Sequence, residues 1–306
     1  MDVERLRLLR EVADRGSITA AAEAAVLTPS AVSQQLKVLA REAGVPLLER
    51  SGRGVRLTDA GRALVRRTDD VLAALAAADE EMAAYRSGPR GTVRIALFPT
   101  GAAMLLPELI TRAATRGIGV SGRDPDRPVG EVQAMLADVD LVVVHQDERD
   151  RPVGTARLRS TELLREPLDV LLPPDHPLAG RDAVALDDLA QDPWISVAEG
   201  WMIDDVLGGM AKAGGFSPHV VQRVIDFRVT EELVAAGVGV ALMPRFVRLA
   251  RPLVRVPLAG IRAARRISVV QRVEATPRPA VEEVVAILRD LGSELARAGQ
   301  LDPVAR

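Results

Sequence analysis

The residues best suited to chemistry lie on one face of a helix predicted over residues 28–41. Helical spacing places hydroxyls, an amide and two cations on a single stripe, which consists of Ser30, Ser33, Gln34, Lys37 and Arg41. In a DNA major groove an amide pairs with adenine, hydroxyls fit either base, and cations bind guanine or phosphate. Solvated helices carry similar faces more often than DNA-reading helices do, so the neighbouring elements have to decide the interpretation.

The start and the opposite face of this helix are also defined in the sequence. Thr28 can cap the free backbone amides, and Pro29 suits the first helical position because proline lacks an amide hydrogen that would have no partner there. The opposite stripe is apolar and consists of Val32, Leu36, Leu39 and Ala43. Residues 28–41 therefore predict a helix whose apolar side packs inside the protein and whose polar side is free to contact a partner.

Two further helices are predicted before it. The apolar residues of the first recur at helical spacing, at Val3, Leu6, Leu9 and Val12. Gly16 ends that helix, and Ser17 or Thr19 caps a short second helix whose small residues 20–25 let another helix approach closely. Residues 26–27 turn the chain into the polar-faced helix, and the three helices together predict a helix-turn-helix.

Two short strands around a glycine turn are predicted at residues 46–57, and they would form a wing. Arg50, Arg53 and Arg56 on this hairpin could contact phosphate or enter the minor groove. An ordinary basic surface hairpin is the alternative, but the helix-turn-helix directly before it favours DNA binding. The predicted DNA contacts are Thr28, Pro29, Ser30, Ser33, Gln34, Lys37, Arg50, Arg53 and Arg56.

A long helix, capped by Thr58 and running to about Arg86, carries a heptad repeat. One series is Leu57, Leu64, Val71, Ala78 and Tyr85, and the interleaved series is Gly61, Thr68, Leu75 and Met82. Such a seam needs a partner helix, and the same helix of a second chain is the economical choice; packing on the chain's own body is the alternative. Acidic residues lie beyond its basic end, where DNA would be absent: Asp69, Asp70, Asp79, Glu80 and Glu81. Residues 87–91 break the helix and mark a domain boundary.

Composition limits the classes of protein. The chain has 306 residues, enough for about two domains, and 48% of them are apolar. No apolar run reaches the roughly 18 to 20 residues of a membrane helix. The charged N-terminus has no signal-peptide core, so a cytoplasmic protein with no membrane association is expected. The chain has no cysteine, and its three histidines are too scattered to suggest a metal site. The net charge of −2 divides into a basic segment 1–68 and an acidic remainder, which suits a DNA-binding head on a body that avoids nucleic acid.

After residue 91 strands alternate with helices. Strands are predicted at 93–98, 140–144, 168–172, 194–197, 219–224 and 240–243, and a helix at 102–116. This alternation predicts an α/β fold with parallel sheets and helices on the faces. Two such series suggest two lobes, with crossovers near 159–167 and 262–268. Because ligands in open sheets bind beyond the carboxyl ends of strands, the cleft between the lobes is the expected pocket.

With these residues described, the chain resembles the LysR-type transcriptional regulators over nearly its full length. The segments 16–23, 28–36, 44–50 and 57–61, the last of them Leu-Thr-Asp-Ala-Gly, are similar to the family's head. The segments 175–180, Asp-His-Pro-Leu-Ala-Gly, and 233–244 are similar to its effector domain. The chain departs from the family pattern at Ala40, Ala43 and Leu48, where Glu, Leu and Phe are usual. These departures remove an ion pair and some packing and leave the proposed contact face intact.

The resemblance implies a winged helix-turn-helix at 1–58, a dimerisation helix and hinge at 59–91, and a two-lobed domain, Rossmann-like and similar to periplasmic-binding proteins, at 92–306. Lobe I would comprise about 92–164 and 268–297, and lobe II about 165–267. It also implies a homo-oligomer, dimer or tetramer, that binds double-stranded promoter DNA. A small-molecule effector in the cleft would change how the dimers sit on a promoter.

Carrying the family's pocket over by position gives the expected effector contacts, which are Pro99, Thr100, Gly101, His145, Gln146, Gly200, Trp201, Met202, Phe227 and Met243. Thr100 is the best-placed polar residue for binding the effector, and this role is favoured over that of a simple helix cap. Phe98, Trp201 and Phe227 favour an apolar or aromatic effector, although these rings could equally belong to the core. A histidine beside an apolar strand, such as His145, is more often a hydrogen-bonded structural residue than a ligand contact. His176 is also expected to be structural.

Catalysis and cofactor binding have no candidate motif. Residues 117–122 spell G-x-G-x-x-G, but a dinucleotide site needs a strand before this motif and a helix after it, and here a helix precedes it. No nucleophile elbow, phosphate loop or paired carboxylate is visible, so neither an enzyme nor a cofactor is expected.

The leading hypothesis is thus an effector-responsive, sequence-specific transcription regulator. A solute-binding or transport component with the same two-lobed fold, and a DNA-binding protein that needs no effector, are the alternatives. The charged N-terminus and the wing argue against the solute-binding alternative. The identity of the effector, the target genes and the sign of regulation are left open by the sequence.

Overall fold

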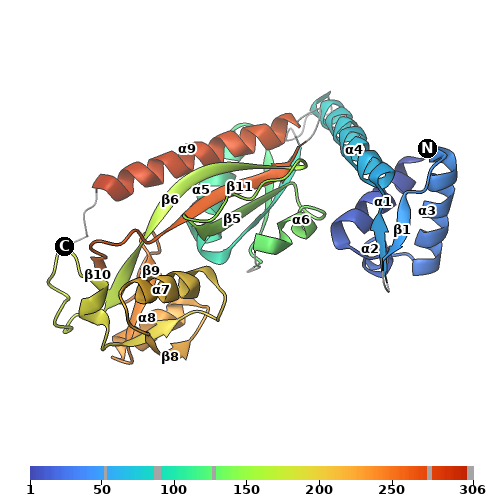
Figure 1. Cartoon of the computed structure of the whole chain (residues 1–306). Coiled ribbons are helices and arrows are strands. Elements are labelled where there is room, and N and C mark those ends of the chain that lie inside the picture. The colour runs from blue at the N-terminus through green and yellow to red at the C-terminus, as the bar shows by residue number, and fades with distance from the viewer. Residues whose placement is uncertain (52–53, 86–90, 126–128, 274–277, 302–306) are drawn as a thin grey trace.

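Three parts follow one another along the chain in the computed structural model, which describes residues 1–51, 54–85, 91–125, 129–273 and 278–301. A small N-terminal head is joined by one long helix to a larger body (Figure 1). The body has two lobes, and the lobe nearer to the head also carries the C-terminal helix along its top.

The head is a winged helix-turn-helix, as predicted, and local signals set its boundaries. Its elements are α1 (Val3–Arg15), α2 (Ile18–Ala24), α3 (Pro29–Ala43), β1 (Leu48–Ser51) and β2 (Gly54–Leu57). Gly16 ends α1 with a left-handed φ of 73°, and Ser17 Oγ then accepts the Ala20 amide of α2 at 3.0 Å. Thr28 Oγ1 caps α3 by accepting the Ala31 amide at 3.2 Å.

The apolar stripe of α3 lies at the centre of the head. Val32, Leu36 and Leu39 are at most 4% exposed and pack in one cluster with Leu9 and Val12 of α1. Burial of each such side chain stabilises the fold by about 1.5 to 3 kcal/mol. This burial fixes the rotation of α3 about its own axis, and thereby directs its polar stripe outward.

The long helix α4 (Asp59–Tyr85) begins at the predicted cap and approaches the head very closely. Thr58 Oγ1 accepts the Gly61 amide at 3.0 Å and donates to the Pro46 carbonyl at 2.7 Å. A Cβ on Gly61 would lie 2.1 Å from the carbonyl oxygen of Leu47, so only glycine allows this approach.

Replacing Gly61 by alanine is therefore expected to destabilise the head by about 1 to 3 kcal/mol, because the added methyl group would force α4 away from Leu47. The free energy of unfolding, measured by urea denaturation, checks this. Gly180→Ala is the control, since a Cβ there meets nothing within 4 Å. Equal stability of the two variants would contradict the close contact.

Two opposite faces of α4 have different environments. Val65, Asp69 and Ala73 are at most 5% exposed and face the chain's own head and body. The C-terminal half of the heptad seam lies on the other side of the helix and is exposed in the single chain, with Val71 at 40%, Leu75 at 41% and Met82 at 51%. An apolar stripe of this kind is the surface that a second helix would cover.

The N-terminal half of the seam has a different role from the one predicted. Gly61 and Thr68 are buried and Leu64 is half-buried, because this part of α4 packs against the head of the same chain. Asp69, one of the acidic residues beyond the basic end of this helix, has a structural role that the sequence did not indicate. Asp69 is buried and accepts hydrogen bonds from Arg157 of the body, the closer at 2.9 Å.

The body contains one continuous set of strands divided between two lobes. In lobe I the order is β4 (Gly119–Arg123), β3 (Thr92–Leu97), β5 (Leu141–Asp147), β11 (Ala264–Arg272) and β6 (Leu158–Leu172). In lobe II the order continues from β6 to β9 (Val240–Pro244), β7 (Pro193–Ser196) and β8 (His219–Arg223), and β10 (Val254–Pro257) also pairs with β6. The long strand β6 is thus shared by both lobes.

The prediction of parallel sheets holds only for part of the body. β3 pairs in parallel with β4 and β5, and β7 with β8 and β9. β6 and β11 instead pair with their neighbours in the antiparallel sense. The physical reason is that β6 carries the chain into lobe II and β11 carries it back, so the two crossover strands run in opposite directions. The strands β4 and β10 were not predicted.

Helices cover both lobes. They are α5 (Pro99–Thr115), α6 (Val132–Met135) and α9 (Pro279–Leu301) on lobe I, and α7 (Met202–Ala213) and α8 (Phe227–Ala235) on lobe II, with single 3-10 turns at Val129–Glu131 and Leu186–Leu189. α5 and α9 pack over β3 in one buried cluster, and α7 packs over β7 and β9 in another. The motif at 117–122 falls on a turn and β4, with α5 before it, so it has no dinucleotide-binding context.

Candidate nucleic-acid interface and effector cleft

The helix α3 lies on the side of the head that is farthest from the body (Figure 1). Ser30, Gln34, Lys37 and Arg41 are exposed and Ser33 is half-buried. Within the described part of the chain, the side chains of Gln34 and Lys37 have no hydrogen-bond or ion-pair partner. An exposed amide and cation without internal partners are available to base edges and phosphates.

The wing is present, and two of its three predicted contacts can be placed. β1 and β2 pair antiparallel, and Arg50 and Arg56 are exposed on them. Arg56 faces its cross-strand partner Glu49 at 2.8 Å, an exposed ion pair that contributes little to stability and can give way to a phosphate. Arg53 lies outside the described residues.

Two cavities between the lobes share one wall. We call the cavity of about 870 Å³ the larger chamber and that of about 450 Å³ the smaller chamber. The residues common to both linings are Phe98, His145, Trp201 and Met202. The larger chamber lies between α5 and α8, and the smaller one between the ends of β3 and β5 and the start of α7. Both volumes fall within the range of small-molecule sites.

Eight of the ten expected effector contacts line these chambers. Pro99, Thr100 and Phe227 line the larger one, Gln146 and Gly200 the smaller one, and the others belong to the shared wall. His145 and Gln146 lie within β5 rather than after it. The Gln146 side chain is held by the following loop, since it donates to the Arg151 carbonyl at 3.3 Å and accepts the Val153 amide at 3.3 Å.

Two expected contacts do not line either chamber. Met243 is fully buried in one core cluster of lobe II with Leu171 and Ile195, so the structure does not support a contact with an effector there. Gly101 is buried against the ring of Phe98, where a Cβ would come within 2.7 Å of the ring. It lets α5 lie close to that ring and offers no surface to a ligand.

A buried ion pair at the floor of the larger chamber was missed. Arg265 of β11 is 2% exposed and donates through Nε to Glu166 of β6, itself fully buried, at 2.7 Å. Arg265 also donates to Thr100 Oγ1 at 3.0 Å and lies over the Phe98 ring at 5.0 Å. Glu166 further accepts the Phe246 amide at 2.7 Å. The only sign in the sequence was a charged pair, Arg265–Arg266, placed before an apolar run.

His145 differs from the hydrogen-bonded structural residue that was expected. Its ring packs edge-on against Phe98 at 4.5 Å, and its Nδ1 is buried without a hydrogen-bond partner among the described residues. Burial and, secondly, the positive charge of Arg265 lower the pKa of His145 to about 3. A neutral imidazole therefore faces both chambers with a polar atom unused. His176, in contrast, is structural as predicted, because it bonds both Asp192 and the Leu178 amide.

The low pKa of His145 predicts a pH dependence of stability. Below about pH 6.5 the unfolded chain binds a proton at this residue that the native chain does not, so the free energy of unfolding falls as the pH drops from about 6.5 toward 3, by up to about 1.4 kcal/mol per unit. His145→Gln should flatten this dependence, measured by urea denaturation between pH 7 and 5. Parallel curves for the variant and the parent protein would show that His145 titrates normally.

The larger chamber has apolar walls and a charged lining that holds Glu108, Asp226 and Glu231 as well as arginines. Met104, Ile203, Phe227 and Phe246 contribute apolar surface, and Phe246 is a fourth aromatic beside the three that were predicted. Arg228 and Arg248 are exposed at the lining and make no ion pair within the described part of the chain. No group of three or more metal-binding side chains occurs in that part, and none of its helices is long and apolar enough to span a membrane.

A winged helix-turn-helix on a long helix, joined to a two-lobed domain with cavities between the lobes, defines a DNA-binding regulator with a ligand-binding domain. The family models agree: residues 3–62 match the bacterial regulatory helix-turn-helix of the lysR family, and residues 86–293 match the LysR substrate binding domain. The chain belongs to the LysR family of transcriptional regulators. The alternative of a solute-binding or transport component does not account for the winged helix-turn-helix head.

Relatives and solved structures cover most of the chain. The transcriptional dual regulator GltC of Bacillus subtilis is 30% identical over 255 residues, which are 80% of this chain and 81% of GltC. A probable hydrogen peroxide-inducible genes activator of Mycobacterium leprae is 29% identical over 78% of this chain and 76% of its own. A structure of a full-length OxyR variant from Pseudomonas aeruginosa covers 100% of this chain and 98% of its own with a TM-score of 0.65 and 21% identity, which shows a shared fold.

Proposed function

We propose that the protein binds promoter DNA in the cytoplasm as a homo-oligomer, reads base edges with α3, and responds to a small molecule bound between the lobes. The outward stripe of α3, with Gln34 and Lys37 unpaired among the described residues, carries the proposal for DNA. The exposed half of the α4 seam supports pairing of two chains, and two-fold symmetry then predicts an inverted-repeat operator.

The effector that best fits the larger chamber is an amphipathic molecule with an apolar or aromatic body and one anionic group. Apolar side chains from both lobes, such as Met104 and Phe227, suit the body. Arg228 and Arg248 suit an anion, because among the described residues neither forms an ion pair, even with the lining carboxylates Glu108, Asp226 and Glu231. His145 Nδ1 and Thr100 Oγ1 supply hydrogen-bonding atoms deeper inside. A ligand that touches Thr100 in lobe I and Phe227 in lobe II would favour a closed cleft.

The DNA-reading role is tested by Gln34→Ala. Loss of a bidentate amide contact should lower the preference for the protein's own promoter over scrambled duplex by about 1 to 3 kcal/mol, which is about 5- to 150-fold. Lys37→Ala is the comparison, because loss of a phosphate contact should weaken binding to both duplexes and reduce the salt dependence. Equal losses on both duplexes for Gln34→Ala would remove it from base reading.

The effector proposal is tested by titrating a panel of aromatic and aliphatic carboxylates against the fluorescence of Trp201, which lines both chambers. Carboxylates should bind more tightly than the matching alcohols, and Arg248→Gln should reduce this difference. Unchanged fluorescence, thermal stability and DNA affinity across the panel would favour the alternative in which the cleft is only a scaffold.

A further inference from the structure

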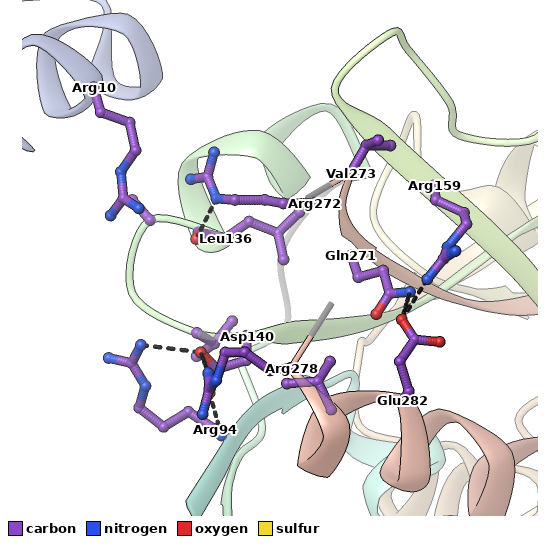
Figure 2. A pocket seen from close by; sticks show the side chains of 13 residues that line it. Arg10, Arg94, Leu136, Asp140, Arg159, Gln271, Arg272, Val273, Arg278 and Glu282 are labelled. Atoms are coloured by element: carbon purple, nitrogen blue, oxygen red, sulfur yellow. Dashed lines mark hydrogen bonds and ion pairs between the residues drawn. The ribbon is translucent and has the colours of Figure 1, made fainter. Parts of the chain in front are cut away.

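A third cavity, of about 100 Å³, lies at the junction of the head and lobe I, and we call it the junction cavity. Figure 2 shows its side chains converging from separate elements, with Arg10 reaching down from the head toward Arg272 of the body. The other arginines in the lining are Arg94, Arg159 and Arg278. The cavity is too small for an aromatic effector or a nucleotide, whose sites span about 300 to 1,000 Å³, but it is large enough for several waters or one tetrahedral oxyanion.

Positive charge is in excess in this lining. Five arginines face it, against the two carboxylates Asp140 and Glu282. Arg94 and Arg278 both bond Asp140, at 3.2 and 2.9 Å, and Arg159 bonds Glu282 at 2.5 Å. Asp140 therefore serves two cations at once, and the carboxylates nearest to Arg10 and Arg272 lie outside the lining, at Glu11 and Asp14.

Two buried carboxylates, Asp14 and Asp69, lie behind the junction and are shared by the cations around them. Arg272 donates to Asp14 at 2.7 Å and to the Leu136 carbonyl at 3.2 Å, and it lies 4.0 Å from Asp69. Arg157 lies 3.8 Å from Asp14. Arg10 is left with longer contacts, 3.9 Å to Asp14 and 3.7 Å to Glu11. Its Nε is buried with no hydrogen-bond partner among the described residues.

The electrostatic environment of Arg10 agrees with this geometry. Burial, and then the charge of Arg272, lower the pKa of Arg10, while Asp14, Asp69 and Glu11 act in the opposite direction and offset part of the shift. The guanidinium stays charged at neutral pH. The Arg10 guanidinium is half-buried, and an anion placed between it and Arg272 would use its free Nε donor and offset the repulsion between the two cations.

We propose that the junction cavity binds a phosphate-type oxyanion, either free or as the terminal group of a small monoester, between Arg10 of the head and the arginines of lobe I. Arg10, Arg94 and Arg272 offer donors from three elements, and arginine donors match the oxygen geometry of phosphate. The bound anion replaces repulsion between Arg10 and Arg272 by attraction to a common partner. It thereby holds the head against lobe I, so that anion binding and head orientation are linked.

The test is isothermal titration of the full-length protein with sodium phosphate, at an ionic strength held constant with sodium chloride. The parent protein should bind phosphate, and Arg10→Gln should raise the Kd at least tenfold. Arg7→Gln is the matched control, because Arg7 is on the same helix with its side chain 53% exposed, and it should leave the Kd unchanged. Arg94→Gln, which leaves Asp140 paired with Arg278, should weaken binding as well if Arg10→Gln proves poorly folded.

Three results would overturn the proposal. One is a heat of binding, or a thermal stabilisation of the protein, that is no greater with phosphate than with chloride. Another is unchanged phosphate binding in both Arg10→Gln and Arg94→Gln. The third is loss of phosphate binding in Arg248→Gln, which would place the anion in the effector cleft instead. Glycerol 2-phosphate distinguishes the two sources, since binding as tight as that of phosphate indicates a monoester site and much weaker binding indicates free phosphate.

Discussion

Replacing Leu75 by glutamate is expected to dissociate the oligomer and to abolish high-affinity promoter binding. Leu75 is 41% exposed in the single chain and lies on the α4 face opposite to the one that contacts the chain's own body. In a two-fold pairing both copies of the change meet the same interface. Losing two leucine burials costs about 3 to 6 kcal/mol, which raises the Kd of the dimer by about 10² to 10⁴-fold.

Sedimentation velocity at micromolar concentration measures the assembly, and a mobility-shift assay on the protein's own promoter measures the consequence. Ala74→Glu is the control, because Ala74 is exposed one position earlier and about 100° around the helix, so the same charge is introduced beside the seam rather than in it. If the Leu75 variant still sedimented as the parent oligomer, another surface would join the chains and the α4 seam would be excluded.

Replacing Arg265 by methionine is expected to lower the free energy of unfolding by about 3 to 5 kcal/mol. Arg265 and Glu166 are both buried, and removal of the cation leaves the Glu166 carboxylate inside the body, where the Phe246 amide at 2.7 Å cannot neutralise its charge. The same change removes the donor that holds Thr100 Oγ1 at 3.0 Å, so ligand binding in the larger chamber should weaken as well. Urea denaturation and the Trp201 titration measure the two effects.

The double variant Arg265→Met with Glu166→Gln separates a lost ion pair from a simple packing defect. Because the second change removes the unpaired charge and keeps an acceptor for Phe246, it should restore a large part of the stability. Arg251→Met is the control, since Arg251 and Glu232 form an exposed pair 2.6 Å apart whose loss should be hard to detect. A double variant no more stable than Arg265→Met would show that packing, and not charge, dominates this site.

The head could be predicted nearly in full because its signals are local. Gly16, Ser17, Thr28 and Thr58 act on backbone groups within three or four residues, so their effect is visible in a short stretch of sequence. The polar stripe of α3 follows from helical spacing alone once the apolar stripe is buried. Base contacts by this stripe remain a proposal.

The effector cleft was predicted less well, for geometric reasons. Adjacent residues of a helix point about 100° apart, so Thr100 can line the chamber while Gly101 packs against Phe98. β9 is covered on both faces, and all five of its residues are buried, so no alternation showed that Met243 faces the core. Arg265 and Glu166 are 99 residues apart, and their pairing depends on the register of β11 against β6.

The sequence by itself determined the order of elements, the capped helices of the head and the apolar seam of α4, because each depends on interactions among near neighbours in the chain. Only the tertiary structure decided which half of that seam is left uncovered, that Asp69 is buried against Arg157, and that Arg10 meets Arg272 across the junction. These features depend on how the head, α4 and lobe I are placed together. Burial and charge at such contacts are set by residues far apart in sequence, and no local pattern encodes them.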